Sequence, residues 1–268
     1  MDYVDLRKIV EKDKELKALG LSDFELLTAY RYLKMKKSND DPNYVPTLRR
    51  SEGLLEIVMM PSRELQAEVE KRKALMNVQS LDTVNFILDA NLAGFKLNTK
   101  EREEAYLKAS RFIDLLKDNK FAKGLYLYGI YGSGKTYLLS AIVEEVAKFK
   151  QVLFVYFPDL VRNLKSSIST NELEDKVTSL KTCDLLVLDD VGSENMTGWF
   201  RDEILSPILQ FRLASGLPVL ISSNFSQKEL IGFMATDRQE TDRIKAARIV
   251  HRIRELTDEV PLTTPFGK

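Results

Sequence analysis

The stretch KGLYLYGIYGSGKTYLLSAI, residues 123–142, contains the residue types that hold a phosphate group. Within it, Gly129 to Thr136 reads GIYGSGKT and fits the pattern G-x-x-x-x-G-K-[ST]. Glycines let the backbone curl so that several N–H groups point at phosphate oxygens. Lys135 supplies a positive charge for the terminal phosphates, and the Thr136 hydroxyl can bind magnesium. The sequence therefore predicts a nucleotide site formed by Gly129, Gly132, Ser133, Gly134, Lys135 and Thr136.

Two carboxylates follow a later apolar run, in the stretch CDLLVLDDVGSE. In a magnesium-dependent nucleotide site, Asp189 would hold the metal, usually through water, and Asp190 would orient or deprotonate the attacking water. A strand that ends in a solvated acidic turn is the simpler explanation of such a pair on its own. Because the pair follows a phosphate loop, the catalytic interpretation is favoured.

Polar residues after two further apolar patterns could complete the site. Asn224 comes after the apolar run LPVLISS, where an amide can sense the terminal phosphate or hold the water; a turn asparagine is the alternative. The segment DRIKAARIVHRIREL is an amphipathic helix in which Arg248 and Arg252, four residues apart, share one face. An arginine delivered to a neighbouring subunit's terminal phosphate accelerates hydrolysis strongly, but a solvated basic face explains the spacing equally well.

The elements that must position these residues follow an alternating order from about residue 99 onward. Near-continuous apolar runs alternate with helical patterns, which predicts an α/β fold with a three-layer parallel sheet buried on both faces. The earlier part reads differently: a charged helical start, a strand at 54–60, a helix at 63–76 that Ser62 could cap, and a helix at 80–95. We expect two domains, 1–90, small and mostly helical α+β, and 91–268.

Composition limits the alternatives. Lys plus Arg and Asp plus Glu both number 40, so the formal net charge is zero and no global basic field indicates nucleic acid. One cysteine, Cys183, and one histidine, His251, exclude a disulfide framework and weaken a zinc hypothesis. The N-terminal stretch is too charged for a signal peptide, and no apolar run approaches the roughly 20 residues that span a bilayer. We expect a cytoplasmic protein without a membrane segment.

Four stretches together resemble the AAA+ helicase loaders of bacterial replication, the DnaI/DnaC type: GLYLYGIYGSGKTYLL, LLVLDDVGSE, PILQFRLASGLPVLISSNFS and KAARIVHRIREL. The resemblance covers residues 100–257 and implies an AAA+ ATPase core without a C-terminal lid. ATP and Mg²⁺ are the implied cofactors. It assigns Lys135 and Thr136 to Walker A, Asp189 and Asp190 to Walker B, Asn224 to sensor I, and Arg248 and Arg252 to the arginine motif, with Arg252 as the finger.

The resemblance also implies a function and partners. ATP would control assembly of the loader on a hexameric replicative helicase and on single-stranded DNA, with self-association on the helicase and weak, DNA-stimulated hydrolysis. Residues 1–90 would bind the helicase. In FPDLVRNLKSSIST, Arg162 and Lys165 are candidate DNA contacts, although a solvated helix face is an equally good explanation.

The N-terminal part departs from the family pattern. DnaI-like N-terminal domains can carry a Cys/His zinc cluster, but the ligands are absent here and Ser62 stands near where a cysteine might be, so no zinc is expected. Apolar packing would have to hold this domain together, through Leu54, Leu55, Ile57, Val58 and Leu65 among others. Two other functions stay open: an IstB-like transposition helper ATPase, which shares the core and arginine motif, and a small-molecule kinase, for which no acceptor pocket or lid is evident.

Overall fold

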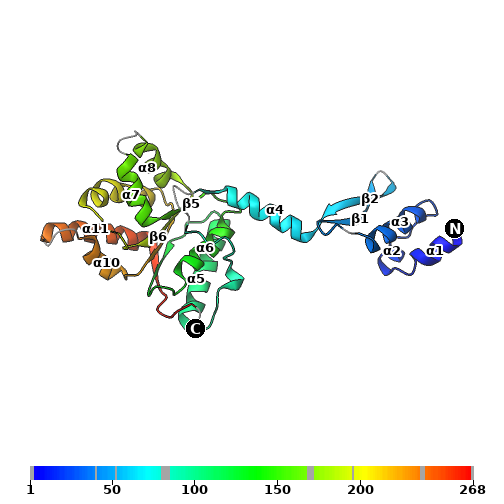
Figure 1. Ribbon diagram of the computed structural model, residues 1–268, viewed down its shortest axis with the longest axis horizontal. Helices are drawn as coiled ribbons and strands as arrows, with labels where there is room; N and C mark the ends of the chain where they lie inside the picture. Colours follow the sequence, from blue (N-terminus) through cyan, green and yellow to red (C-terminus); the bar gives the residue numbers. More distant parts are fainter. Residues whose placement is uncertain are drawn as a thin grey trace. The chain divides into compact units, whose positions relative to one another are not determined.

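The computed structural model describes residues 3–39, 41–51, 53–79, 85–167, 172–194, 196–235 and 239–266. The chain divides into two compact units, Met1–Arg72 and Lys73–Lys268 (Figure 1). The sequence predicted a boundary at 90/91, later than this division. Two contacts before residue 91 already belong to the second unit: Val78 pairs with Val152, and the Ile87 N–H donates to Ser140 Oγ at 3.1 Å.

The first unit contains three helices and a hairpin. The helices are α1 (Tyr3–Val10), α2 (Lys14–Ala18) and α3 (Leu26–Lys37), and β1 (Tyr44–Ser51) pairs antiparallel with β2 (Leu54–Pro61). The Asp13 side chain accepts from two N–H groups at the start of α2, a common N-cap. The small core of the first unit consists of Leu6, Val10, Leu16, Leu21, Leu26, Ala29 and Tyr32.

Sequence patterns predicted this unit in part. The predicted strand at 54–60 corresponds to β2, and the predicted helix at 63–76 is α4 (Arg63–Met76), where Ser62 Oγ accepts from Leu65 N. Of the apolar residues expected to pack, Leu55 and Ile57 contact the core, whereas Leu54 is 68% exposed. Strand β1 was not predicted, because its sequence YVPTLRRS mixes a proline with charges and lacks an apolar run.

The second unit is built on a six-stranded parallel sheet, which confirms the predicted three-layer α/β fold. Its strand order is β3-β5-β6-β7-β4-β8. The strands are β3 (Val78–Gln79), β4 (Gly124–Tyr128), β5 (Val152–Tyr156), β6 (Leu185–Val191), β7 (Val219–Ser223) and β8 (Thr257–Pro261).

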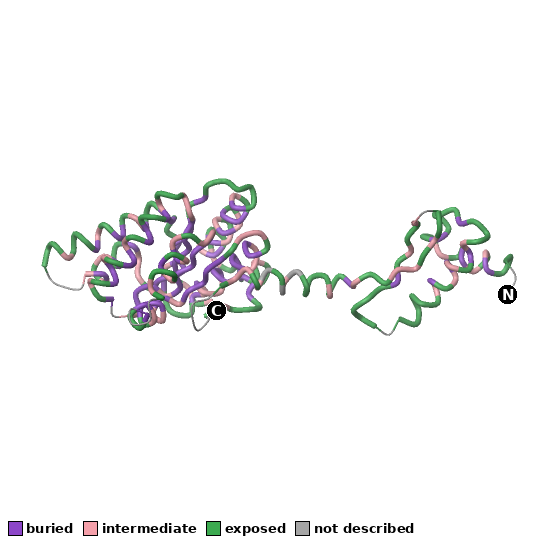
Figure 2. The backbone as a smooth tube through the Cα atoms, turned by 90° about the horizontal axis from the view of Figure 1, so that it is seen from above, coloured by how far each residue is buried: buried purple, intermediate pink, exposed green. Residues whose placement is uncertain are grey.

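Helices cover both faces of this sheet. One face packs against α5 (Lys100–Lys117) and α6 (Lys135–Val146). The other packs against α7 (Phe157–Ser167), α8 (Leu173–Thr182), α9 (Ser206–Ala214), α10 (Gln227–Met234) and α11 (Glu240–Leu256). The buried residues concentrate along the strands between these two layers (Figure 2). A sheet covered on both faces needs apolar side chains on both, which is why β4 to β7 are apolar along most of their length.

Three features of the second unit differ from the sequence prediction. The helix expected at 80–95 is absent from the described residues 85–91, and a 3₁₀ turn (η1, Leu92–Gly94) follows; residues 80–84 lie outside the described part. Instead of a helical hydrogen-bond ladder, this segment has bonds to the core of the second unit, from Asn85 to Asp189 and from Ile87 to Ser140. The helical pattern before β7 begins as a π-helix (η2, Phe200–Leu205) rather than as an α-helix. Edge strand β8 was not predicted, since its sequence TDEVP is charged.

No helix in the described ranges is long and apolar enough to cross a membrane.

Candidate nucleotide-binding site

The loop between β4 and α6 has the backbone of a phosphate cradle. The φ values of Gly129, Gly132 and Gly134 are 147°, 72° and 92°, which residues other than glycine rarely adopt. Space is also restricted: a Cβ on Gly129 would lie 1.9 Å from the Leu262 carbonyl oxygen, and one on Gly134 would lie 2.6 Å from the Phe266 ring. Gly134 is the N-cap of α6, so the first N–H groups of this helix face the loop.

Lys135, the first residue of α6, points back into this loop. Its Nζ donates to the carbonyl oxygens of Gly129 and Ile130 and to Asn224 Oδ1, each at 2.9 Å. The side chain is buried, and this burial lowers the pKa of Lys135. A buried ammonium group held by neutral oxygens is well placed to bind an anion, because a phosphate would supply the countercharge.

Asp189, at the end of β6, accepts hydrogen bonds from three elements. Thr136 Oγ1 lies 3.1 Å from each carboxylate oxygen, Ser222 Oγ donates at 2.5 Å, and Asn85 Nδ2 donates at 3.4 Å. The residue is fully buried, and burial raises the pKa of Asp189. A hydroxyl and a carboxylate in contact beside a phosphate loop are the oxygen ligands that Mg²⁺ prefers, so these residues fit the expected metal.

Asp190 and Asn224 meet next to this pair. Asp190 has a φ of 63°, a left-handed conformation uncommon outside glycine, and its N–H donates to Ser222 Oγ at 2.8 Å. Asn224 Nδ2 lies 3.4 Å from Asp190 Oδ1, while its amide oxygen accepts from Lys135. Asn224 therefore bridges the loop lysine and the second acidic residue.

Two residues of this network were not predicted. Ser222 accepts from the Asp190 N–H and donates to Asp189, so it fixes the Asp189 carboxylate and the backbone of Asp190. Its signal was present, since it belongs to the polar end of the apolar run LPVLISS. Asn85 left no such signal, because its segment was predicted to be helical.

A cleft of about 340 Å³ opens over the loop. Lys135, Thr136, Asp190 and Asn224 line it on the phosphate side. Its aromatic lining residues are Tyr131, Tyr137 and Phe266.

The two arginines of α11 lie away from this cleft. Arg248 and Arg252 line a separate groove of about 540 Å³ between α9 and α11. Arg252 donates from Nε to Gln210 Oε1 at 2.8 Å and from Nη1 to Ser206 Oγ at 2.9 Å, whereas Arg248 is exposed. Neither lines the nucleotide cleft of its own chain.

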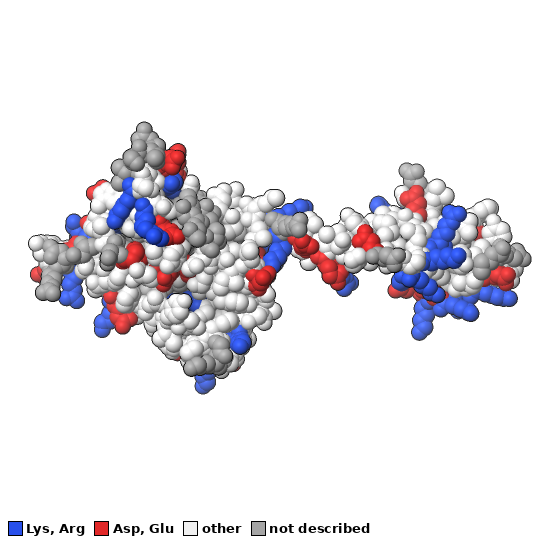
Figure 3. All heavy atoms as spheres, viewed as in Figure 1, with Lys and Arg blue, Asp and Glu red and all other residues white. Residues whose placement is uncertain are grey.

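The candidate DNA residues lie on α7. Arg162 pairs with Asp159 on the same helix, and Lys165 is exposed in its last turn. In the view of Figure 3, basic and acidic side chains lie together over the corner formed by α7 and α8. Neither residue lines the nucleotide cleft.

Glu194 is a further acidic residue near the site. It lies in the loop after β6, where its carboxylate oxygens are buried, and this burial raises the pKa of Glu194 to about 7. Across the described ranges, no group of three or more His, Cys, Asp or Glu residues could hold a metal ion.

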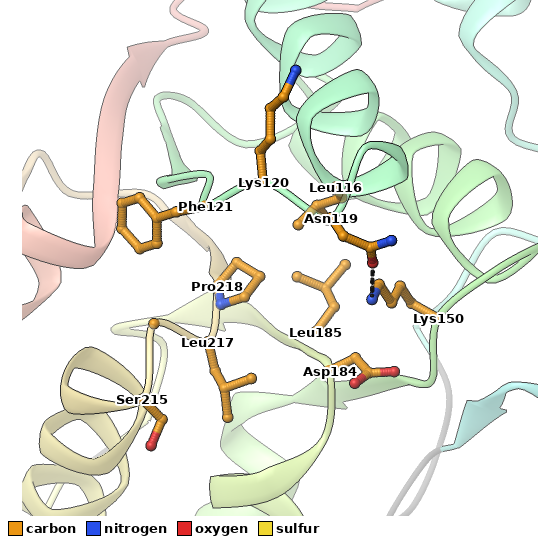
Figure 4. Close-up of a pocket in the computed structure, with 11 residues that line it drawn as sticks. Leu116, Asn119, Lys120, Phe121, Lys150, Asp184, Leu185, Ser215, Leu217 and Pro218 are labelled. Atoms are coloured by element: carbon orange, nitrogen blue, oxygen red, sulfur yellow. Dashed lines mark hydrogen bonds between the residues drawn. The ribbon is translucent and has the colours of Figure 1, made fainter.

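A second cavity, of about 330 Å³, opens at the N-terminal ends of the strands, opposite the nucleotide cleft. Phe121, Leu217 and Pro218 line it, and Lys150 Nζ donates to Asn119 Oδ1 at 2.8 Å (Figure 4). Strand β4 separates it from the phosphate loop.

The strand order, the phosphate loop and the acidic pair define an ATP-binding P-loop protein with the AAA+ fold. A family model described as IstB-like ATP binding protein matches residues 48–257. The replicative helicase loader DnaI of Bacillus subtilis is 32% identical over 273 residues, which cover 96% of this chain and 87% of DnaI.

Solved structures agree with this assignment. A crystal structure of DnaI superposes with a TM-score of 0.65 at 39% identity, over 70% of this chain and 98% of that one. A putative primosome component from Streptococcus pyogenes serotype M3 superposes with a TM-score of 0.59 at 29% identity, over 73% and 98%. This chain belongs to the family of IstB-like ATP-binding proteins, in the group that contains the DnaI helicase loader.

Proposed function

We propose that this protein is an ATP-controlled loader that binds the hexameric replicative helicase and helps place it on single-stranded DNA. One observation carries the proposal: the similarity to DnaI extends over 96% of the chain and so includes the N-terminal unit. An ATPase core alone is shared by many functions, since function depends on the sites that a fold carries. The N-terminal unit is the part that distinguishes a loader from other ATPases of this fold.

In this proposal the cleft binds ATP with Mg²⁺. Thr136 and Asp189 hold the metal, which supplies positive charge at the terminal phosphates. Lys135 and the N–H groups at the start of α6 bind the phosphates. Asp190 orients or deprotonates the attacking water, and Asn224, in contact with both Lys135 and Asp190, positions that water relative to the terminal phosphate.

The arginines of α11 act on a neighbouring subunit. Support comes from their placement in the α9–α11 groove, away from the cleft of their own chain. Arg252 is our choice for the finger, because Gln210 and Ser206 fix the direction of its guanidinium group. Arg248, one turn earlier on the same face, contacts the phosphates secondarily. Hydrolysis is then weak in the isolated chain and rises when subunits assemble on the helicase and on DNA.

The N-terminal unit binds the helicase. It exposes large apolar side chains, among them Phe24, 90% exposed, and Tyr3, 56% exposed. The last turn of α3 adds Lys34, Lys36 and Lys37, and on the face drawn in Figure 3 basic side chains predominate on this unit. Exposed apolar groups beside charges are typical of protein interfaces. This unit is held by apolar packing and needs no zinc.

The DNA contact lies in the second unit, where Arg162 and Lys165 on α7 contact the DNA backbone.

Co-purification tests the proposal and its main alternative. The tagged protein should capture the replicative helicase of its own organism as a hexamer, and more of it with ATP than without nucleotide. A variant that lacks residues 1–62, the part before α4, supplies the control: it should still bind ATP and should no longer capture the helicase. The matching family model is described as IstB-like, and an IstB-like transposition helper is the alternative that the sequence left open. Capture of a transposase without any helicase would favour that second function and contradict ours.

A further inference from the structure

A short segment after β8 lies beside the phosphate loop, because β8 pairs in parallel with β4. In this C-terminal strap, residues 262–266, the Leu262 N–H donates to the Tyr128 carbonyl at 2.7 Å, and the Phe266 N–H donates to the Gly132 carbonyl at 2.8 Å. Each end of the strap is therefore bonded to the segment that holds the phosphates. Any displacement of the loop must also move the strap.

A buried arginine holds the strap from the other side. Arg102, fully buried in α5, donates from Nη2 to the Ser133 carbonyl in the loop at 2.8 Å and to the Thr264 carbonyl in the strap at 3.1 Å. Its guanidinium carbon lies 4.9 Å from the Phe266 ring centroid and 5.4 Å from that of Phe95, distances typical of cation–π contacts. The Phe266 ring is thus fixed in place rather than free at the end of the chain.

These contacts place the Phe266 ring in the nucleotide cleft beside Tyr137. The two ring centroids are 4.9 Å apart, and both side chains are only half-buried. Tyr137 directly follows the magnesium-binding Thr136, and its hydroxyl is fixed by the Asn91 carbonyl at 3.3 Å. Tyr131, the third aromatic residue of the cleft, is 94% exposed, and its ring has no such support from the described residues.

We propose that Phe266 and Tyr137 form the wall of the cleft that contacts the nucleobase, so that the C-terminal strap helps the site select a nucleotide over a bare polyphosphate. The inference deepens the proposed ATP site and rests on it. Flat apolar faces are what a base needs, because every base presents a π-face and stacks on aromatic rings. The cleft combines cationic and hydroxyl groups with these aromatic rings, and a nucleoside triphosphate needs both kinds of lining, for its phosphates and for its base.

The test compares ATP with inorganic tripolyphosphate, both with Mg²⁺, as ligands of the full chain. Phe266→Ala should weaken ATP binding about tenfold, which is the effect of losing one stacked ring. The dissociation constant of tripolyphosphate should stay unchanged. Phe266→Leu keeps apolar volume against Gly134 and should show the same selective loss, which guards against misfolding of the alanine variant. Phe121→Ala removes a ring that is 64% exposed in the opposite cavity (Figure 4) and should change neither ligand.

Several results would overturn the inference. An equal loss for ATP and tripolyphosphate would mean that the ring only shapes the loop, and no loss for either would mean that it does not contact the nucleotide. Tighter ATP binding by Phe266→Ala would mean that the ring occupies the position of the base. Wild-type protein that binds ATP no better than tripolyphosphate would exclude base recognition altogether. No helicase is present in this assay, so failure of the loader proposal would leave its outcome unaffected.

Discussion

Replacement of Lys135 by methionine should separate ATP binding from stability. Methionine keeps most of the length of the side chain and removes the ammonium group. In the nucleotide-free protein this group donates to three neutral oxygens, those of Gly129, Ile130 and Asn224. Of the three acceptor residues, Asn224 lines the cleft, where water can replace the lost donor.

The two effects differ in size because the lysine has opposite roles in the two states. Burial lowers the pKa of Lys135, so the folded state destabilises the charged form relative to the unfolded chain, and removing that charge relieves this cost. We expect the free energy of unfolding without nucleotide to change by less than about 1 kcal/mol. A charge-assisted hydrogen bond to phosphate contributes roughly 3 kcal/mol, so ATP affinity should fall about a hundredfold.

Urea unfolding and titration calorimetry measure the two quantities on the same sample. Lys123→Met is the matched control: this lysine precedes β4 at the opposite end of the strand and donates to the Arg254 carbonyl at 3.3 Å. The control should keep wild-type ATP affinity. Unchanged ATP affinity in Lys135→Met, or a loss of more than about 2 kcal/mol of nucleotide-free stability, would refute the reasoning.

Three further predictions concern the rest of the site. Asp190→Asn should keep ATP affinity and lower hydrolysis at least tenfold in a phosphate-release assay, because asparagine tolerates the φ of 63° but cannot accept a proton; normal turnover would exclude Asp190 as the base. Arg252→Ala should lower hydrolysis at least about tenfold in the helicase-bound assembly and leave the isolated chain unchanged, whereas an equal loss in a proven monomer would exclude action in trans. Glu194 has a folded-state pKa of about 7 against an ordinary value of 4.5, so its contribution to stability is present at low pH and is lost as pH rises from about 4.5 to 7. In urea unfolding Glu194→Gln should remove roughly 2 kcal/mol of this decline, and an unchanged pH profile would contradict the assignment.

Much of the ATPase unit was predictable because its signals are local. The glycines of the loop, the apolar strand before it and the acidic pair at the end of β6 each follow from a few neighbouring residues. Parallel strands that all end at one edge then bring these groups together, which the structure bears out in the contacts of Lys135 with Asn224 and of Thr136 with Asp189.

The remaining features depend on contacts between distant parts of the chain. Asn85 reaches Asp189 only because residues 85–91 are held against the core instead of forming the predicted helix. Strand β8 forms because β4 offers a free edge for pairing, and its charged sequence gives no apolar alternation. The position of the Phe266 ring depends on its contact with Arg102, which lies 164 residues earlier in the sequence. Such pairings leave no periodic pattern in a single sequence.

The most direct test of the account is a loading assay on closed circular single-stranded DNA with the replicative helicase of the same organism. With ATP, this protein should increase the amount of hexameric helicase that stays on the circle after a high-salt wash, and Lys135→Met should abolish the increase while Lys123→Met preserves it. Helicase retention that is the same with and without the protein would contradict the assignment as a loader.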